Sequence, residues 1–562
     1  MNNYILPSTL LCDFYKTSHK AVYPKGTEVI YSTFTPRSNK YFPIANEVVV
    51  FGIQGFVKKY LVDYFNENFF KRSKNEVVNE YNRIIKFTLG EQYVDSEHIE
   101  KLHDLGYLPI KLKALKEGTL SPIKVPVMTI ENTHPDFFWL TNYLETLIST
   151  EIWQPMTSAT ISHQYRNLFD EYALKTVGNT LGVDFQGHDF SMRGMSSLES
   201  AMTSGAGHLL SFTGTDTIPA ILYHEKYYNA NVENELVGAS IPATEHSVMS
   251  AGTSADGDRD EYETFKRIIT EVYPEGLVSI VSDTYDFWKV VTETLPQLKE
   301  NILSRDGKVV IRPDSGDPVD ILCGKKLPEF DTIEDAFDDY EMEFSHDAKL
   351  MLKHDEDRTS YKENYELRVD DKVVTLHFKA YKGEYEIDEY RDYSVRKITA
   401  EDKGLIECLW ETFGGLITDK GYKVLDSHIG AIYGDSITYN RAKEICERLE
   451  VKGFASINVV YGIGSYTFQY NTRDSFGFAM KATYAVINGE EKLLFKDPKT
   501  DDGTKRSQRG KVKVYETNGS IAYVDGLYSE SNFNDDLLED VFVDGKLIRD
   551  QSLSEIRAIL NN

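Results

Sequence analysis

The sequence is poor in cysteine and has no long hydrophobic run. Its four cysteines, Cys12, Cys323, Cys408 and Cys446, form no Cys-x-x-Cys pair. This excludes a zinc ribbon and a disulfide framework, and it favours four reduced thiols in a cytoplasmic protein. No apolar run reaches the roughly 18 residues of a membrane span, and no basic segment precedes an apolar run at the N-terminus. We therefore expect neither a membrane contact nor a signal peptide.

Basic residues are scarce relative to acidic ones. The chain has 62 Lys and Arg against 89 Asp and Glu, which gives a net charge of -27. Because nucleic-acid binding needs a basic face, no nucleic-acid partner is expected. Any phosphate must bind in a locally basic site. Hydrophobic residues make up 41% of the 562 residues, enough for a sizeable core, and the length predicts about three or four domains.

The common nucleotide-binding signatures are also missing. The sequence contains no GxxxxGK[ST] and no GxGxxG motif, and it lacks the paired acidic residues common in Rossmann-like phosphoribosyl-diphosphate sites. The sequence is also poor in arrangements of Cys or of Ser and His that would indicate a nucleophile. What remains is a set of polar clusters at the ends of short apolar runs.

Near the N-terminus, short β-rich runs alternate with helical ones. Residues Glu28–Phe34 predict a strand. Residues Glu47–Leu61 and Asp136–Ile152 have apolar positions three and four apart, which predicts helices.

From residue 157 onward, short apolar strands end in polar or glycine-containing turns and are followed by helical stretches. The predicted strands are Leu277–Ser282, Lys308–Ile311, Ala431–Tyr433 and Ile457–Tyr461. This alternation predicts a parallel α/β barrel or a doubly wound sheet. In both folds the reacting groups lie at the carboxyl ends of the strands. The residues placed there are Asp283, Arg312, Asp314, Asp435 and Gly464.

Residues 323–400 interrupt this alternation of strands and helices. Between Glu329 and Asp357 there are 12 acidic and two basic residues, and a hairpin is predicted around Asp370 and Asp371. We interpret the segment as an acidic, β-containing insertion between two barrel strands. It is either a solvated appendage or a partner surface.

Four polar segments are candidates for chemistry. Phe190 and Arg193 precede Asp216 in a stretch rich in glycine and small residues, where backbone can approach a ligand closely. His246 follows Glu245, although a lone histidine is more often structural. An Arg with carboxylates, here Arg312 and Asp314, suits a magnesium-bound polyphosphate, or it forms a surface ion pair before a turn.

The fourth segment, Tyr461–Asp474, follows a β-like run and contains Gly462, Gly464, Ser465 and Arg473. Its backbone N–H groups suit a phosphate cradle. Farther on, basic residues gather in 496–513, including Lys496, Lys505 and Arg506. They form a charged surface loop or contact nucleotide phosphates.

Together these segments resemble the nicotinamide phosphoribosyltransferase family. The resembling pieces occur in the family's order and span nearly the whole chain: CDFYKTSHKAVYPKGT, FGIQGFVKKYL, HDFSMRGMSSLESA, GTDT, IPATEHS, VSDTYD, IRPDSGDP, YGDS, YGIGSYTFQYNTRD and LFKDPKTDDGTKRSQRGK. The long insertion is similar to that of bacterial and phage members.

The resemblance implies a type II phosphoribosyltransferase fold, an irregular α/β barrel with a second mixed α/β domain from both chain ends. The expected parts are 1–156 (mixed domain), 157–322 (barrel), 323–400 (insertion), 401–482 (barrel) and 483–562 (return to the mixed domain). It also implies a homodimer with active sites at the interface. The implied reaction joins nicotinamide to 5-phosphoribosyl 1-diphosphate in NAD biosynthesis.

By resemblance, Phe190 and the partner subunit's Tyr15 sandwich the pyridine ring, and Asp216 accepts a hydrogen bond from the carboxamide. The donor would be held by the other matching residues: Arg193 and Arg312 at the phosphates, Asp314 at the ribose or magnesium shell, Gly434 and Asp435 along the ribose, and Gly464, Ser465 and Arg473 at the 5-phosphate. The sequence departs from the animal members at Ser465 and Tyr466, where those carry further glycines.

The resemblance further implies Mg²⁺ and ATP. His246 matches the family's phosphorylated histidine, with Asp283 as its expected hydrogen-bond partner. No direct protein ligand to Mg²⁺ is expected; the diphosphate holds the ion, with Asp283 or Asp314 reaching it through water. Lys496, Lys505 and Arg506 would meet the ATP phosphates. The alternatives are a nicotinate phosphoribosyltransferase, which Asp216 disfavours, and a catalytically silent nucleotide-binding scaffold.

Overall fold

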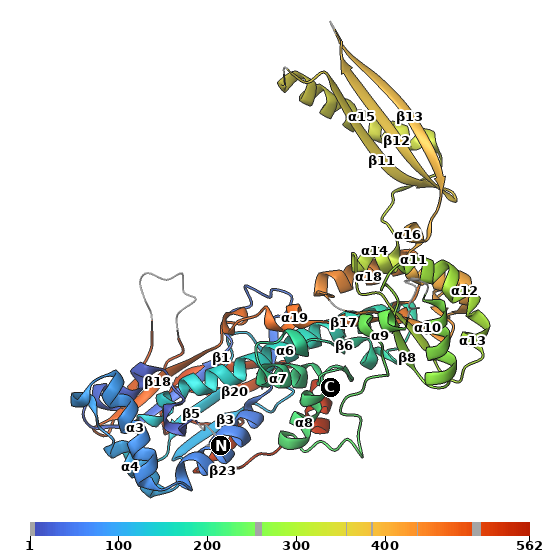
Figure 1. The fold of residues 1–562 in the computed structure, drawn as a ribbon. Helices are drawn as coiled ribbons and strands as arrows, with labels where there is room; N and C mark the ends of the chain where they lie inside the picture. Colours follow the sequence, from blue (N-terminus) through green and yellow to red (C-terminus); the bar gives the residue numbers. More distant parts are fainter. Residues whose placement is uncertain are drawn as a thin grey trace.

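The computed structural model describes residues 6–252, 261–355, 357–383, 386–434, 436–496 and 507–561. It has three parts: an antiparallel sheet domain, a parallel barrel and an insertion that projects from the barrel (Figure 1). None of the helices within these ranges combines the length and apolar character that a bilayer crossing requires.

The sheet domain is built from both ends of the chain. Its central strand β1 (Thr27–Thr35) pairs antiparallel with β5 (Met128–Asn132) on one side and β18 (Ala479–Ile487) on the other. The strand order is β19-β18-β1-β5-β3-β22-β23. The remaining strands are β3 (Ile110–Ala114), β19 (Glu490–Leu493), β22 (Glu539–Val543) and β23 (Lys546–Leu547), with ribbons β2 (Glu47–Val49)–β4 (Leu120–Pro122) and β20 (Lys511–Thr517)–β21 (Ser520–Leu527).

The predicted helix over Glu47–Leu61 is wrong at its start. Residues Glu47–Val49 form strand β2 because the consecutive β-branched valines are buried and pair with β4. Gly52 then adopts a left-handed φ of 93°, and α2 (Ile53–Phe56) begins directly after it and continues helically through residues 57–70. The other helices of this domain are α1 (His19–Val22), α3 (Lys74–Thr88), α4 (Glu97–Leu105), α5 (Leu140–Tyr143) and α20 (Leu553–Leu560).

The second part of the structure is an irregular α/β barrel, as predicted. Six parallel strands lie in the order β7-β6-β17-β16-β9-β8. Residues 239–244 close the ring, since Ala239 bridges Gly214 of β7 and Ala243 bridges Ser279 of β8. The strands are β6 (Gly187–Asp189), β7 (Gly214–Thr215), β8 (Val278–Val281), β9 (Val309–Arg312), β16 (Ile429–Tyr433) and β17 (Val459–Ile463).

Helices cover the barrel, and one of them ties it to the sheet domain. The long helix α6 (Glu145–Thr176) places Ile148 in the core of the sheet domain and Phe169 in the core of the barrel. Phe169 stacks on Tyr461 of β17 with ring centroids 4.5 Å apart. The other helices are α7 (Leu198–His208), α8 (Ile218–Tyr227), α9 (His246–Ala251), α10 (Tyr262–Arg267), α11 (Phe287–Lys289), α12 (Leu295–Gln297), α13 (Lys299–Leu303), α14 (Pro318–Cys323), α16 (Ala400–Lys403), α17 (Leu405–Phe413), α18 (Tyr439–Val451) and α19 (Ser465–Gln469).

Shorter elements complete the chain. Strands β14 (Gly415–Ile417) and β15 (Lys423–Leu425) form a small ribbon beside the barrel. Single helical turns occur at Ser8–Leu10, Phe14–Ser18, Glu91–Tyr93, Pro135–Phe137, Val183–Phe185, Met192–Gly194, Ser456–Asn458 and Arg473–Ser475.

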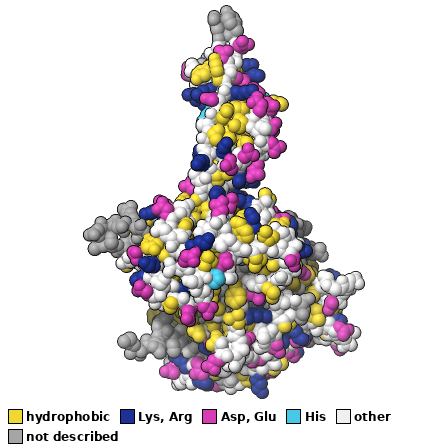
Figure 2. All heavy atoms as spheres, turned by 90° about the vertical axis from the view of Figure 1, so that its right-hand side faces the viewer, with side chains coloured by type: hydrophobic (Ala, Val, Ile, Leu, Met, Phe, Trp, Pro, Cys, Tyr) yellow, Lys and Arg dark blue, Asp and Glu magenta, His cyan; other side chains and the backbone are white. Residues whose placement is uncertain are grey.

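The insertion has its own core. Helix α15 (Ile333–His354) packs Phe337 and Phe344 onto a sheet in the order β10-β11-β12-β13, where Phe378 is buried. The predicted hairpin around Asp370 is confirmed. Figure 2 shows the insertion as a projecting column with acidic and basic side chains interspersed on the visible face. Its strands are β10 (Glu329–Phe330), β11 (Ser360–Val369), β12 (Lys372–Lys382) and β13 (Ile387–Lys397).

The two connections to the insertion meet at a contact between glycines. A Cβ on Gly404 would lie 2.1 Å from the backbone nitrogen of Gly324, so the chain leaves and returns at the same point. Lys452, which directly follows α18, donates hydrogen bonds to the carbonyl oxygens of Cys323 (2.9 Å) and Lys403 (2.6 Å), one on each connection. The barrel ring therefore closes without the insertion.

We predict that the insertion can be removed without loss of chemistry. Replacing residues 325–398 by a short Gly-Ser linker should leave kcat/KM within about threefold of the full chain, because the strand-end residues lie on other elements. Steady-state kinetics on both proteins check this. A large loss of activity in a variant with an unchanged melting temperature would assign the insertion a catalytic role.

Candidate active site

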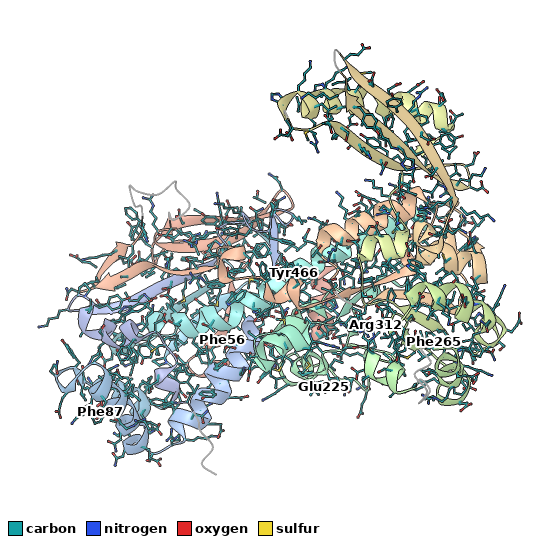
Figure 3. The ribbon with its side chains drawn as sticks, turned by 45° about the horizontal axis from the view of Figure 1, so that its top comes forward. Phe56, Phe87, Glu225, Phe265, Arg312 and Tyr466 are labelled. Atoms are coloured by element: carbon teal, nitrogen blue, oxygen red, sulfur yellow. The ribbon has the colours of Figure 1, made fainter. Side chains whose placement is uncertain are left out.

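The carboxyl ends of the barrel strands bring most of the predicted residues to one rim. Because parallel strands share a direction, the residues that follow them gather at the same end of the barrel. Figure 3 shows Arg312 among the barrel elements, whereas Phe56 and Phe87 lie in the other domain. The rim carries Phe190 and Arg193 after β6, Asp216 after β7, Asp283 after β8, Arg312 and Asp314 at β9, Gly434 after β16, Gly464 and Ser465 after β17, and His246 after the closing segment.

Phe190 has Arg312 and His188 as close neighbours. The guanidinium carbon of Arg312 is 4.8 Å from the centroid of the Phe190 ring, and the ring of His188 is 4.4 Å from it. The Phe190 backbone N–H donates to the carbonyl oxygen of Ile463 at 3.0 Å, which fixes the loop after β6 against β17. We name His188, Phe190, Asp216 and Arg312 the rim cluster.

Asp216 is held as a carboxylate. Its Oδ1 accepts a hydrogen bond from His188 Nε2 at 2.9 Å and one from Ser240 Oγ at 2.6 Å. Burial by itself raises the pKa of Asp216, but these two hydrogen bonds and the charges of His188 and Arg312 outweigh burial, so the pKa lies below its usual value. The side chain is therefore ionised at neutral pH and remains so into the acidic range.

Sequence reasoning did not single out His188 or Ser240. His188 precedes Phe190 by two residues on β6, so alternation along the strand could have placed both side chains on one face. Ser240 carries no comparable signal, because its position depends on the closing segment that pairs with β7 and β8.

A second group of charges lies beside the rim cluster. Asp283 Oδ2 accepts hydrogen bonds from the Asp314 backbone N–H at 3.0 Å and from Ser315 Oγ at 2.5 Å. His246 Nε2 lies 3.9 Å from Asp283 Oδ1 and 3.9 Å from Asp314 Oδ2. These distances exceed a hydrogen bond. The hydrogen bond that His246 does form links its Nδ1 to Thr284 Oγ1 at 3.3 Å, not to Asp283 as expected.

Two buried polar atoms of this group lack partners. Among the described residues, neither Arg312 Nε nor Asp283 Oδ1 has a hydrogen-bond partner, although both atoms are buried. Such atoms are costly unless a ligand satisfies them. They suit a ligand that carries both anionic oxygens and a hydrated cation.

Gly434 keeps Arg312 and Asp314 in place. A Cβ at Gly434 would lie 2.3 Å from Asp314 Oδ1 and 2.7 Å from Arg312 Nε. A similar close approach occurs at Gly194, where a Cβ would lie 2.1 Å from Ser465 Oγ. Glycine at these two positions therefore lets the side chains of Arg312, Asp314 and Ser465 lie directly against the backbone of the loops after β16 and β6.

The variant Gly434→Ala should lower kcat/KM by about 10- to 100-fold, because the added methyl group displaces two side chains at the rim. The melting temperature should change by only a few degrees, since both displaced groups are flexible side chains. Kinetics and thermal unfolding of the same preparation check this. Full activity in the variant would show that the positions of Arg312 and Asp314 are unimportant.

Arg473 lies with Tyr15 rather than in the rim cluster. Both line a cavity of about 250 Å³ at the start of α6, together with Asp13, Glu145, Thr146, Ser149, Thr150 and Trp153. Tyr15 is 58% exposed. Lys496 is exposed, and Asp435, Lys505 and Arg506 lie outside the described residues. A further cavity of about 850 Å³ lies between the barrel and the base of the insertion, away from the strand ends.

The thiols do not contribute a nucleophile. All four cysteines are free, and burial raises the pKa of Cys323, Cys408 and Cys446 to about 12. Burial also raises the pKa of Cys12. Since the thiolate is the reactive form, burial disfavours a nucleophilic role for these side chains.

A closed α/β barrel with this rim, joined to a sheet domain from both chain ends, defines a type II phosphoribosyltransferase fold. A nicotinate-nucleotide pyrophosphorylase from Pyrococcus furiosus has a similar fold, with a TM-score of 0.51 and 13% identity over 100% of this chain and 97% of that one. The model of the nicotinate phosphoribosyltransferase family matches residues 185–354 and 380–546, and the N-terminal domain of nicotinamide phosphoribosyltransferase matches residues 8–112. The chain belongs to the nicotinate phosphoribosyltransferase family.

Full-length relatives narrow the resemblance. A nicotinamide phosphoribosyltransferase of Acinetobacter baylyi is 44% identical over 97% of this chain and 95% of its own length. One of Mycoplasma pneumoniae is 31% identical over 91% of this chain and 96% of its own length. The family resemblance seen in the sequence motifs is thereby confirmed.

Proposed function

We propose that this protein is a nicotinamide phosphoribosyltransferase, which converts nicotinamide and 5-phosphoribosyl 1-diphosphate to nicotinamide mononucleotide and diphosphate. The observation that carries the proposal is the ionised Asp216 beside Phe190 and Arg312. A carboxylate accepts a hydrogen bond from an amide NH₂, whereas nicotinate would place a second carboxylate against it. The names of the two full-length relatives agree.

A nicotinate-using enzyme is the second candidate, because the matching family model carries that name. Asp216 opposes it for the reason just given. A catalytically silent nucleotide-binding scaffold is the third. The unpartnered buried atoms Arg312 Nε and Asp283 Oδ1 favour a site that binds a ligand, and product formation separates the enzyme from the scaffold.

The pyridine ring stacks on Phe190. Stacking of a heteroaromatic ring on an aromatic side chain contributes about 1–3 kcal/mol. The second face is covered by Tyr15 of the partner subunit in a homodimer. Tyr15 and Arg473 line one cavity, so we propose that both act together across the interface. The positive charge of Arg473 then meets the donor phosphates of the partner's site, rather than those bound by its own Ser465.

The donor lies over Arg312, Asp314 and the glycine loops. Arg193 and Arg312 bind its phosphates, Gly434 and Asp435 line the ribose, and Gly464 and Ser465 present backbone N–H groups to the 5-phosphate. Asp283 and Asp314 fit a hydrated Mg²⁺, because Asp283 Oδ1 is buried without a hydrogen-bond partner and the Asp314 backbone N–H donates to the other oxygen of Asp283. When bound, Mg²⁺ supplies charge neutralisation at the leaving diphosphate.

The reaction itself needs no protein nucleophile. The bond from ribose C1 to diphosphate breaks with its electron pair on the diphosphate oxygen, and the pyridine nitrogen supplies the pair for the new bond. The ribose gains positive charge in the transition state. The protein contributes by positioning both substrates and by stabilising charge with Arg312, Asp314 and backbone donors.

ATP stimulation is proposed to run through His246. A phosphoryl group on this half-exposed imidazole would lie near Asp283 and Asp314, at the diphosphate side. Lys496, Lys505 and Arg506 are proposed to contact the ATP phosphates. In His246→Ala, stimulation by ATP should disappear while basal transfer continues. Equal stimulation in the variant would refute the phosphohistidine.

The proposed activity is tested by incubating purified protein with nicotinamide, 5-phosphoribosyl 1-diphosphate and Mg²⁺. Mass spectrometry should show nicotinamide mononucleotide, and a coupled assay should show diphosphate in equal amount. Absence of both products at saturating substrates, with the protein folded, would leave the scaffold as the better account.

A further inference from the structure

Both hydrogen bonds to Asp216 reach the same oxygen. His188 Nε2 and Ser240 Oγ approach Oδ1 at 2.9 and 2.6 Å. Among the described residues, no hydrogen bond reaches Oδ2. The carboxylate is therefore asymmetric: one oxygen has its partners within the protein, and the other is available to a ligand. The side chain is 43% exposed, so a small molecule can approach it.

Strands β6 and β7 and the segment that closes the barrel hold Asp216 and its two hydrogen-bond donors in place. His188 lies on β6, is only 8% exposed and stands beside the Phe190 ring. Gly214 of β7 packs against it so closely that a Cβ there would lie 2.8 Å from His188 Nδ1. The Asp216 backbone N–H donates to the carbonyl oxygen of Asp189 at 2.9 Å.

Ser240 belongs to the segment that closes the barrel. The Ala239 N–H donates to the Thr213 carbonyl oxygen at 2.7 Å, and the Thr215 N–H donates to the Ala239 carbonyl oxygen at 3.0 Å. These bonds place Ser240 next to the turn that carries Asp216. Both donors to Oδ1 are thus held by backbone pairing between strands.

We infer that His188 and Ser240 are positioning residues that occupy Oδ1 of Asp216 and leave Oδ2 as the acceptor for the substrate carboxamide. The inference rests on the proposed function and deepens it, because it assigns the discrimination between amide and acid to three residues rather than one. Without the two donors, the carboxylate can rotate, accept water at either oxygen and take up a proton more readily. A protonated Asp216 would no longer repel nicotinate.

A purely structural role for His188 makes different predictions. Loss of a residue that only packs would lower the melting temperature. If it also distorted the rim, it would weaken the binding of nicotinamide, nicotinate and 5-phosphoribosyl 1-diphosphate alike. Replacing a positioning residue should raise the KM for nicotinamide more than it lowers kcat. It should also reduce the ratio of kcat/KM for nicotinamide to kcat/KM for nicotinate. The KM for 5-phosphoribosyl 1-diphosphate should not change.

The test uses His188→Leu, His188→Gln and Ser240→Ala in the full chain. Glutamine carries an N–H donor close to the position of histidine Nε2, whereas leucine keeps the bulk and lacks the donor. His377→Leu is the control, since His377 hydrogen-bonds Asn364 and Ser394 on the insertion. For each variant we would measure steady-state kinetics with nicotinamide and with nicotinate, the KM for 5-phosphoribosyl 1-diphosphate and the melting temperature.

His188→Leu should lower the nicotinamide-to-nicotinate ratio of kcat/KM by about 10- to 100-fold, mainly through KM for nicotinamide. Ser240→Ala should lower it by a smaller factor, His188→Gln should restore most of it, and His377→Leu should match the parent. An unchanged ratio in a folded His188→Leu, or equal losses with both substrates, would overturn the inference. If His188→Leu does not fold, an unchanged ratio in Ser240→Ala does the same.

Failure of the proposed function would be observed separately, because the parent protein itself would then form no nicotinamide mononucleotide. In that case calorimetric titration with nicotinamide decides the inference. Weaker binding to His188→Leu than to the parent supports it, and equal binding contradicts it.

Discussion

Replacing Arg312 with alanine should lower kcat/KM for nicotinamide mononucleotide formation by about 100- to 1,000-fold. The Arg312 guanidinium lies over Phe190, contributes to the low pKa of Asp216 and lies 3.9 Å from Asp314. Arg312 therefore lies close both to the side of the rim where nicotinamide is proposed to bind and to the side where 5-phosphoribosyl 1-diphosphate is proposed to bind. Steady-state kinetics measure the loss.

Arg312→Lys should recover only part of the activity, because lysine keeps the charge but not the planar fork that binds phosphates. Arg391→Ala is the matched control. Arg391 pairs with Glu334 and Glu341 on the insertion and lies over Phe337, so it repeats the cation–aromatic contact away from the rim. Near-normal activity in a folded Arg312→Ala would remove Arg312 from the proposed site.

Replacing Asp216 with serine should lower the preference for nicotinamide over nicotinate by about 100-fold or more. Serine removes the charge that repels a substrate carboxylate, and its hydroxyl can donate to one. The rate with nicotinamide should fall and the rate with nicotinate should rise. Competition between the two substrates in one reaction, followed by mass spectrometry, measures the ratio directly.

Asp419→Ser, in the exposed turn between β14 and β15, controls for the loss of an aspartate elsewhere on the barrel. It should leave the preference unchanged. If Asp216→Ser retains the parent's preference, the carboxylate does not read the amide, and the inference about His188 and Ser240 fails with it.

The barrel and its rim were predictable because two signals coincide in the sequence. Short apolar runs gave the strands, and polar residues followed each run, as at Arg312 after β9 and Gly464 after β17. Parallel strands then bring those residues together. The strand over Glu47–Val49 was mistaken for helix, because apolar spacing alone does not separate a buried strand from a buried helix.

The neighbours of Asp216 and Arg473 were not predictable in the same way. Ser240 reaches Asp216 only because residues 239–244 close the barrel, a pairing between distant segments. By resemblance Arg473 was assigned to the 5-phosphate with Gly464 and Ser465, and its place beside Tyr15 in one cavity could not be predicted from the sequence. Contacts between segments far apart in the chain depend on the tertiary fold, which local patterns do not encode.

The central claim is that an uncharged pyridine amide stacks on Phe190 and donates a hydrogen bond from its carboxamide to an ionised Asp216. It is tested most directly by comparing nicotinamide and nicotinate as substrates of the purified protein, with 5-phosphoribosyl 1-diphosphate and Mg²⁺ present. We predict a kcat/KM for nicotinamide at least about 100-fold higher than that for nicotinate. Equal values, or a higher value for nicotinate, would contradict the claim.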